Sequence, residues 1–387
     1  MEKRKILIVA HHLTVGGAQK SMLTALRTID YEQNDVTLYL RKKRLDMLPQ
    51  VDPRVTVIAN EDPTRYYRKP YALWALLRLK LCRKEEKRAE LRARLSERIR
   101  EDMLRYESAR YFAGKRFDVA IAYIQGYSAD IVADGVEAER KYLFYHSSTD
   151  EAHELHDRIF GAFDKIIGVN AGVREVLRGL YPKWQDKMTY LCNYVDAAEV
   201  TTKSRASVKR PEGLLLCSCG RVAKVKGFDM AIEAAVMLKQ KGFSFTWWIV
   251  GDGPERPALE EKIAALNLQD TVIITGMEAN PYPRMAACDI YVQPSYEESH
   301  SLTVEEAKIL CRPVVSTETV GGKLLVEPEK TGLLCEISAA DLAAKLERLM
   351  TDDALRARMT EALAQIDHTN DEAVYRESWA KLLEGRL

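Results

Sequence analysis

The chain has 387 residues, of which 47% are hydrophobic and 30% are charged, and its formal net charge is +1. This length exceeds what one hydrophobic core usually serves, so we expect two domains. The small net charge excludes a global attraction to nucleic acid, and no stretch approaches the ~20 apolar residues of a membrane-spanning helix. The seven cysteines are an odd number without clustered C-x2-C spacing, which predicts reduced thiols in a cytoplasmic protein.

Strands and helices alternate from the start of the chain. Residues 6–10 form an apolar run typical of a buried strand, and residues 18–29 have the spacing of an amphipathic helix. Gly16 and Gly17 lie between the two, where a doubly wound fold brings its backbone close to a phosphate group. An ordinary turn is the alternative for such a pair. The alternation continues along the chain and predicts an α/β fold with parallel sheets.

Residues 65–84 combine basic, aromatic and aliphatic side chains. They include seven lysines and arginines and no acidic residue, a composition that suits an anionic membrane surface. Residues 85–110 mix charges of both signs at helical spacing, as a solvated helix does. The alternative is therefore a surface helical hairpin that touches no lipid. We find no nucleic-acid-binding motif and expect no nucleic-acid partner.

Histidines provide two candidate sites in the next part of the chain. His146 directly follows a predicted strand at 141–145, and ligands of open α/β sheets bind beyond the carboxyl ends of strands. A structural role is the alternative for a lone histidine. His153 and His156, each followed by an acidic residue, could suggest a metal site. They lie in a polar segment of helical spacing without further ligands, so we predict a solvated helix face there.

The alternation restarts after a polar segment at 198–211, rich in lysine, serine and threonine, which we predict to be an interdomain linker. Residues 214–219 form the next strand, and Arg221 and Lys226 bracket the loop after it. At the carboxyl end of a strand, two cations could neutralise a diphosphate and stabilise its charge as it leaves. Ordinary surface charge is the alternative for either residue taken alone.

Residues 289–316 have the pattern of a short strand, a polar turn, a helix and another strand. Glu298 lies in the turn and Glu306 in the second turn of the helix. The first N–H groups of a helix have no intrahelical partner, so its start favours an anion such as a diphosphate. Glu306 could accept hydrogen bonds from hydroxyls of a sugar or a ribose. A capping carboxylate and a solvated glutamate are the alternatives.

Three motifs carry a family resemblance. Residues 294–302, PSYEESHSL, followed by Glu306 and Ala307, resemble the E-x7-E motif of the retaining family 4 glycosyltransferases, with serines for its two glycines and a histidine for its aromatic residue. Residues 220–227, GRVAKVKG, resemble the G-R-x-x-x-x-K-G signature of that family. Residues 16–19, GGAQ, resemble its G-G-A-E loop with glutamine in place of glutamate.

The resemblance implies the GT-B fold, in which two doubly wound Rossmann-like domains face each other across a cleft. Residues 1–198 would bind the acceptor and residues 199–370 the nucleotide sugar, with a last helix at 371–387 that can cross back to the first domain. The resemblance further implies retention of anomeric configuration by front-face attack, in which the leaving diphosphate helps to take the proton. Because the chain has no D-x-D triplet, we expect no metal and no other cofactor.

The resemblance also implies roles for single residues. The expected catalytic residues are Glu298, His146, Arg221 and Lys226. The expected donor-binding residues are Gly16, Gly17, Arg221, Lys226, Glu298, Ser299, His300, Ser301, Leu302 and Glu306.

The predicted function is transfer of a sugar from a nucleotide-diphosphate sugar, with UDP as the expected nucleotide, to a saccharide acceptor. A lipid-linked acceptor in cell-surface polysaccharide or glycolipid synthesis fits the basic, aromatic segment at 65–84. It would put a cytoplasmic protein at the inner face of the cell membrane. The alternatives are a soluble or protein acceptor, and a protein that binds a sugar nucleotide without catalysis.

Overall fold

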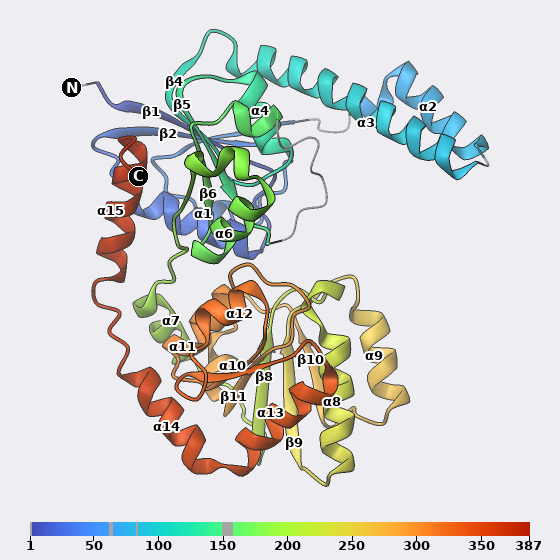
Figure 1. Cartoon of the computed structure of the whole chain (residues 1–387), viewed down its shortest axis with the longest axis vertical. Coiled ribbons are helices and arrows are strands. Elements are labelled where there is room, and N and C mark those ends of the chain that lie inside the picture. The colour runs from blue at the N-terminus through green and yellow to red at the C-terminus, as the bar shows by residue number, and fades with distance from the viewer. Residues whose placement is uncertain (1, 62–64, 83, 149–157) are drawn as a thin grey trace.

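The computed structural model describes residues 2–61, 65–82, 84–148 and 158–387. The chain forms two α/β units, one above the other in Figure 1, and a helical arm extends from the upper unit. Each unit is built on one parallel sheet, which confirms the predicted α/β class. His153 and His156 lie outside the described residues.

The first sheet has seven parallel strands in the order β3-β2-β1-β4-β5-β6-β7. Its strands are β1 (Arg4–Ala10), β2 (Asn34–Leu40), β3 (Thr56–Ala59), β4 (Arg116–Ala122), β5 (Glu137–Tyr145), β6 (Lys165–Gly168) and β7 (Met188–Tyr190). Alternate residues of β1 supply the cores on the two faces of the sheet. Ile6 and Ile8 enter one core and Leu7 and Val9 the other, and all four are fully buried.

Helices cover both faces of this sheet. They are α1 (Gly17–Thr28), α4 (Tyr127–Gly135), α6 (Ala171–Leu180) and, from the end of the chain, α15 (Asp371–Leu383).

A helical arm fills the connection from β3 to β4. It consists of a short 3-10 turn (Arg65–Arg68), α2 (Pro70–Leu81) and α3 (Glu85–Glu107), and it stands off from the sheet in Figure 1. Side chains of the two helices form a small core of their own, made of Ala72, Ala75, Leu79, Leu95, Ile99 and Met103. The helix predicted at 85–110 is therefore present, and with α2 it packs as a helical hairpin.

The second sheet has six parallel strands in the order β10-β9-β8-β11-β12-β13. Its strands are β8 (Leu214–Cys219), β9 (Phe245–Val250), β10 (Val272–Gly276), β11 (Ile290–Gln293), β12 (Val314–Thr317) and β13 (Gly332–Cys335). Its helices are α7 (Ala197–Ser204), α8 (Phe228–Gln240), α9 (Arg256–Ala265), α10 (Tyr282–Ala287), α11 (Leu302–Ile309), α12 (Val320–Leu325), α13 (Ala339–Thr351) and α14 (Asp353–Ala364). Leu215 and Leu216 of β8 again enter opposite cores.

The segment predicted as a linker at 198–211 begins as a helix instead. Asp196 caps α7 by accepting a hydrogen bond of 2.9 Å from the N–H of Glu199. Val200 is the one residue of α7 that is buried. Because a single buried residue gives no apolar periodicity, the composition of the segment concealed this helix.

The last helix returns to the first unit. Trp379 of α15 stacks on Phe144 with ring centroids 5.4 Å apart, and Tyr375 and Leu382 enter the same core. The chain therefore crosses between the units twice, at residues 191–196 and at residues 365–370. Among the described residues, no helix is long and apolar enough to span a membrane.

Candidate functional site

The loops that carry the predicted motifs follow strands at the reversal point of each sheet. The strand order reverses between β1 and β4 in the first sheet and between β8 and β11 in the second, and ligands of doubly wound folds bind at such points. Gly16 and Gly17 follow β1, Arg221 and Lys226 follow β8, and Glu298 follows β11. The fold therefore puts residues from all three motifs where ligand binding is expected.

Glu306 of α11 is buried where the two units meet, with 2% of its side chain exposed. Lys20 of α1 donates a hydrogen bond to its Oε1 at 3.1 Å, and the hydroxyl of Tyr282 in α10 donates to the same oxygen at 3.1 Å. Burial is the largest single influence on the pKa of Lys20 and lowers it. The attraction and hydrogen bond of Glu306, together with nearby Cys219 and Glu199, more than offset burial, so the pKa is raised. This ion pair links the first unit directly to the second.

The other carboxylate oxygen of Glu306, Oε2, is buried and accepts no hydrogen bond from the described residues. Leaving a buried acceptor unpaired costs about 1–3 kcal/mol, so such an atom in a native protein calls for an explanation. A hydroxyl group of a ligand is the kind of donor that would satisfy it. The arrangement therefore suits the predicted role of Glu306 toward a sugar or a ribose.

Lys226 and Glu298 form an ion pair of 2.6 Å between the loop after β8 and the turn after β11. Gly227 permits this close approach. Its φ is +65°, and a Cβ on it would overlap the carbonyl oxygen of Pro294. The backbone N–H of Tyr296 in the turn donates a hydrogen bond of 2.9 Å to the carbonyl oxygen of Val225 in the loop, which holds the turn against the loop. Two predicted residues from separate motifs are thus in direct contact.

Arg221 is exposed at the start of the same loop. Within the part of the chain that the structure describes, its guanidinium group forms no hydrogen bond or ion pair. Its positive charge also affects His12, in the loop after β1. Burial is the main cause that lowers the pKa of His12, and the charges of Lys42, Arg44 and, to a smaller extent, Arg221 lower it further. Lys226 is already neutralised by Glu298, so Arg221 is the predicted cation that remains available to an anion.

His146 follows β5, as predicted, at the carboxyl end of the strand. Its Nε2 lies 2.8 Å from the carbonyl oxygen of Tyr123, so Nε2 carries the proton and donates it. Burial lowers the pKa of His146 to about 4, although the hydrogen bond to Tyr123 acts in the opposite direction. The imidazole is therefore neutral at pH 7, and its Nδ1 keeps a lone pair that can accept a hydrogen bond.

The other predicted donor-binding residues, Ser299, His300, Ser301 and Leu302, are buried in the turn and at the start of α11. Asn170 donates from its Nδ2 to the carbonyl oxygen of Ser299 at 2.7 Å, and the same nitrogen lies 3.2 Å from Nδ1 of His300. Ser301 caps α11 with its hydroxyl. These side chains hold the shape of the turn, and Asn170 ties the turn to the first unit.

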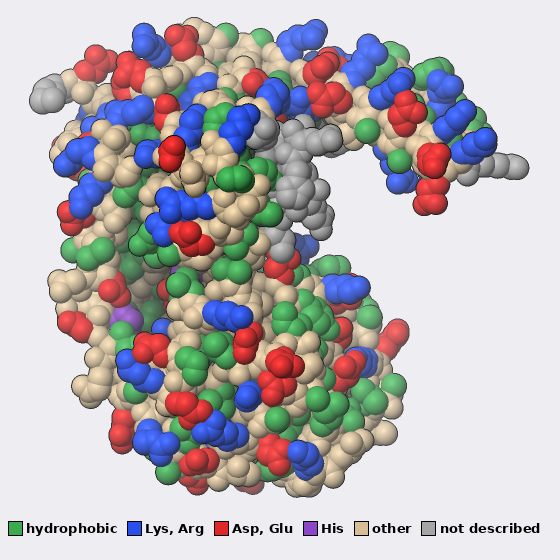
Figure 2. Space-filling view, viewed as in Figure 1, with side chains coloured by type: hydrophobic (Ala, Val, Ile, Leu, Met, Phe, Trp, Pro, Cys, Tyr) green, Lys and Arg blue, Asp and Glu red, His purple; other side chains and the backbone are tan. Residues whose placement is uncertain are grey.

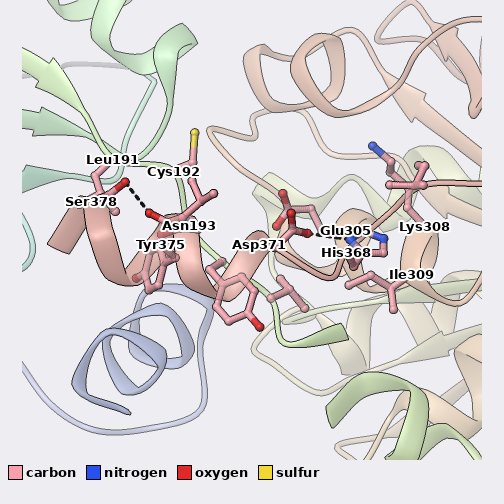
Figure 3. A pocket seen from close by; sticks show the side chains of 14 residues that line it. Leu191, Cys192, Asn193, Glu305, Lys308, Ile309, His368, Asp371, Tyr375 and Ser378 are labelled. Atoms are coloured by element: carbon pink, nitrogen blue, oxygen red, sulfur yellow. Dashed lines mark hydrogen bonds and ion pairs between the residues drawn. The ribbon is translucent and has the colours of Figure 1, made fainter. Parts of the chain in front are cut away.

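A cavity of about 320 Å³ lies behind α11, where the chain crosses between the units. Its lining comes from both crossings, from α11 and from α15, including Asn193, Lys308, His368 and Tyr375 (Figure 3). Glu305 also lines it, whereas the next residue, Glu306, contacts Lys20 of the first unit. None of the described residues that line this cavity was predicted as a site residue. Among the described residues, no group of three or more His, Cys, Asp or Glu side chains is placed to hold a metal ion.

Comparison with known protein families identifies the second unit. The family described as "Glycosyl transferases group 1" matches residues 199–365. The chain carries a glycosyl transferases group 1 domain. Arg221, Lys226, Glu298 and Glu306 all lie within the match, and the expected relationship to glycosyltransferases is confirmed.

Curated relatives of this chain are named glycosyltransferases. The alpha-D-kanosaminyltransferase of Streptomyces kanamyceticus is 33% identical over 187 residues, which are 46% of this chain and 48% of the relative. LpsE, a lipopolysaccharide core biosynthesis glycosyltransferase of Rhizobium meliloti, is 28% identical over 200 residues, 51% of this chain and 57% of the relative. The chain therefore spans about half the length of the curated relatives it matches.

A solved structure shares the complete architecture. HepE of Anabaena, crystallised in complex with UDP-glucose, superposes with a TM-score of 0.71 over 98% of this chain and 99% of its own, at 16% sequence identity. At that identity the likeness concerns the fold, and it confirms the expected GT-B arrangement of two Rossmann-like domains.

Three residues at the group 1 domain were missed by the sequence prediction. Lys20 and Asn170 belong to the first unit and donate hydrogen bonds to residues of the second. Tyr282 donates to the same oxygen of Glu306 as Lys20 does. Each had a weak local signal. Lys20 comes directly after the GGAQ loop, Asn170 follows a strand and caps α6, and Tyr282 begins a helix after β10. Their partners could not be named because the contacts join distant parts of the chain.

Proposed function

We propose that this protein is a glycosyltransferase that moves a sugar from a nucleotide-diphosphate sugar to a saccharide acceptor. One observation carries the proposal. Glu306, in the E-x7-E segment of the group 1 domain, is buried and keeps one carboxylate oxygen without a donor among the described residues. The paired hydroxyls of a nucleotide ribose would supply donors to that carboxylate. UDP is the proposed nucleotide, because HepE, which shares this fold, was crystallised with UDP-glucose.

The cations of the loop after β8 would act on the diphosphate. Arg221 is exposed and available, and Lys226 sits against Glu298 at 2.6 Å. We propose that Arg221 contacts the diphosphate directly and stabilises the charge that grows on it as the sugar departs. The ammonium group of Lys226 would interact with both the diphosphate and Glu298. Glu298 would contact the donor sugar. These two cations provide the neutralisation that a metal ion provides elsewhere, so we propose a reaction without a metal requirement.

The proposed reaction retains the configuration of the anomeric carbon. The bond from that carbon to the diphosphate oxygen breaks, and the acceptor hydroxyl forms its bond on the same face. The acceptor's proton passes to an oxygen of the leaving diphosphate. His146, neutral at pH 7, would accept a hydrogen bond from a donor-sugar hydroxyl at Nδ1 and so orient the sugar. Gly16 and Gly17 would let the backbone after β1 approach the donor closely.

The proposed acceptor is a lipid-linked saccharide in the synthesis of a cell-surface polysaccharide or glycolipid. LpsE, a relative over about half of its length, is named for lipopolysaccharide core biosynthesis, and the basic segment at 65–84 suits an anionic membrane. The protein would then work in the cytoplasm at the inner face of the cell membrane. A soluble acceptor is the second candidate, since the kanosaminyltransferase is a comparable relative.

Calorimetric titration with UDP, GDP and ADP tests the nucleotide site. We expect one of them to bind the wild-type protein and Glu306→Ala to weaken that binding about 10- to 100-fold, since hydrogen bonds to a charged group contribute about 1.5–3 kcal/mol. Glu347→Ala is the matched control, because that carboxylate pairs with Lys241 at the surface of the second unit and its loss should leave the affinity unchanged. Binding that is equal in all three proteins would refute the role of Glu306. Release of UDP from a UDP-sugar only when acceptor is present separates a transferase from a binding protein.

A further inference from the structure

The outward face of α2 carries an unusual group of exposed apolar side chains. Five of its twelve residues are large hydrophobic side chains with 39% to 73% of their surface exposed, namely Leu73, Trp74, Leu76, Leu77 and Leu81. Every other helix or strand in the described ranges exposes at most one such side chain. Single exposed hydrophobic residues need no explanation, but a contiguous group on one helix marks a contact surface.

Helical geometry puts these five side chains on one side of α2. At 100° per residue they cover an arc of ~160°, centred near Leu73 and Leu77. Ala72, Ala75 and Leu79 lie on the opposite side and pack against α3. The inner face thus already has its partner within the arm, and the outer face has none among the described residues.

The charged residues of α2 itself are all of one sign. The sequence of α2 contains Arg78 and Lys80 and no acidic residue. Arg78 lies over the ring of Trp74, 4.6 Å from its centroid, and Lys80 falls within the apolar arc. The neighbouring helix α3 differs, because it carries seven acidic and seven basic residues and so has no net charge. Figure 2 shows blue and green side chains together on this arm.

We propose that the outer face of α2 docks the protein on an anionic lipid bilayer. The helix would lie along the surface with Leu73, Leu77 and Leu81 at the boundary between headgroups and acyl chains. Trp74 is suited to that boundary, and Lys80 can extend along the apolar surface to a lipid phosphate. With twelve residues, α2 is ~18 Å long and too short to cross a hydrocarbon core of ~30 Å. This inference deepens the membrane location proposed above, but it does not rest on the proposed reaction, because α2 contains none of the proposed donor-binding residues.

Charge and area favour lipid over a protein partner. The face measures roughly 18 by 10 Å, whereas a stable protein interface buries about 800 Å² on each partner. Pairing two copies through α2 would bring Arg78 and Lys80 of one chain close to those of the other. An anionic bilayer offers both the apolar interior that the leucines need and the negative charge that the two cations need.

Co-sedimentation of the full chain with vesicles tests the proposal without any nucleotide or acceptor. We would compare phosphatidylcholine vesicles with and without phosphatidylglycerol, at low and high salt. Leu77→Glu should lower the bound fraction at least tenfold, and Leu266→Glu, at an exposed leucine of the second unit, should not. Arg78→Gln/Lys80→Gln should weaken binding and its salt dependence, whereas Arg92→Gln/Arg94→Gln on the exposed side of α3 should change neither.

Three results would overturn the proposal. The first is a wild-type protein that sediments with no vesicle, and the second is a Leu77→Glu variant that binds as well as wild type. The third is binding to vesicles of phosphatidylcholine alone that is equal at low and high salt. A concentration-dependent dimer that Leu77→Glu abolishes would assign the face to a second copy of the chain instead. Because Leu77 is 57% exposed, its substitution should leave the thermal unfolding midpoint unchanged, and circular dichroism would check this. Loss of vesicle binding with intact nucleotide binding would separate this inference from the proposed function.

Discussion

The two units of the chain share one topology but differ in how they contribute to the site. In the second unit, the loops after the neighbouring strands β8 and β11 supply Arg221, Lys226 and Glu298, and the family match covers residues 199–365. The first unit instead sends isolated residues, such as Lys20 and His146, from separate loops and helices. It also carries the helical arm in the connection from β3 to β4.

This difference has a functional meaning under the proposed reaction. A nucleotide diphosphate is common to many sugar donors, so the unit that binds it can keep a fixed set of cations and carboxylates. The acceptor and its location vary between enzymes, so the other unit can differ in its insertions and surface. The arm between β3 and β4 would then belong to the particular task of this protein, and the loops of the second unit to the shared chemistry.

Arg221→Ala tests the contribution of the second unit most directly, and the largest effect is expected there. We predict that kcat falls about 100- to 1,000-fold with little change in the KM for the donor, since charge on the diphosphate grows in the transition state. Steady-state kinetics with the donor measures this. Lys224→Ala removes an exposed cation from the same loop and is the control. Equal losses in kcat and in donor affinity would instead mean that Arg221 serves ordinary binding.

Gly227→Ala tests whether the close approach of two loops within the second unit is essential. We predict a destabilisation of about 2–4 kcal/mol, because alanine adds strain at positive φ and a clash with the Pro294 carbonyl. Gly213→Ala is the matched control: its φ is +79° but its Cβ would meet open space, so a loss of only about 1 kcal/mol is expected. Urea unfolding of the three proteins gives both numbers. Similar losses in the two variants would show that backbone strain alone matters at Gly227.

Lys20→Met tests the link between the two units and should have the smallest effect of the three. We predict that the nucleotide binds about 3- to 10-fold more tightly, because Lys20 occupies Oε1 of Glu306, the oxygen that the second of the paired ribose hydroxyls would contact. Lys20→Arg keeps the charge and should stay close to wild type. Calorimetric titration measures both variants. Weaker binding in Lys20→Met would mean that Lys20 turns toward the nucleotide, and the first unit would then share in donor recognition.

The fold could be predicted well because its signals are local. Apolar runs such as 214–219 and helical periodicities such as 18–29 need no knowledge of distant contacts, and the structure has a strand and a helix at these places. The segment at 198–211 was mispredicted for the converse reason. Asp196 starts α7 through one side-chain cap, and a single buried valine leaves no periodic pattern.

The site was predicted in part. Lys226 and Glu298 were both named from motifs, but their mutual ion pair depends on how two loops pack. Lys20 and Glu306 lie 286 positions apart, so only the assembled fold brings them together. The arm shows the same limit. Both faces of α2 are apolar in sequence, and packing on α3 decides that Leu79 is buried while Leu77 is exposed.

The return of α15 to the first unit has a consequence for synthesis on the ribosome. Residues 199–365 can complete the second unit as soon as they emerge, since its cores draw on no later part of the chain. The first unit cannot complete its core until α15 has been synthesised, although its strands are made earlier. Trp379 and Leu383 of α15 fill that core beside Phe144 and Tyr123. During that interval the aromatic face of its sheet remains uncovered and prone to association. Order of synthesis and order of completion are therefore reversed in this protein.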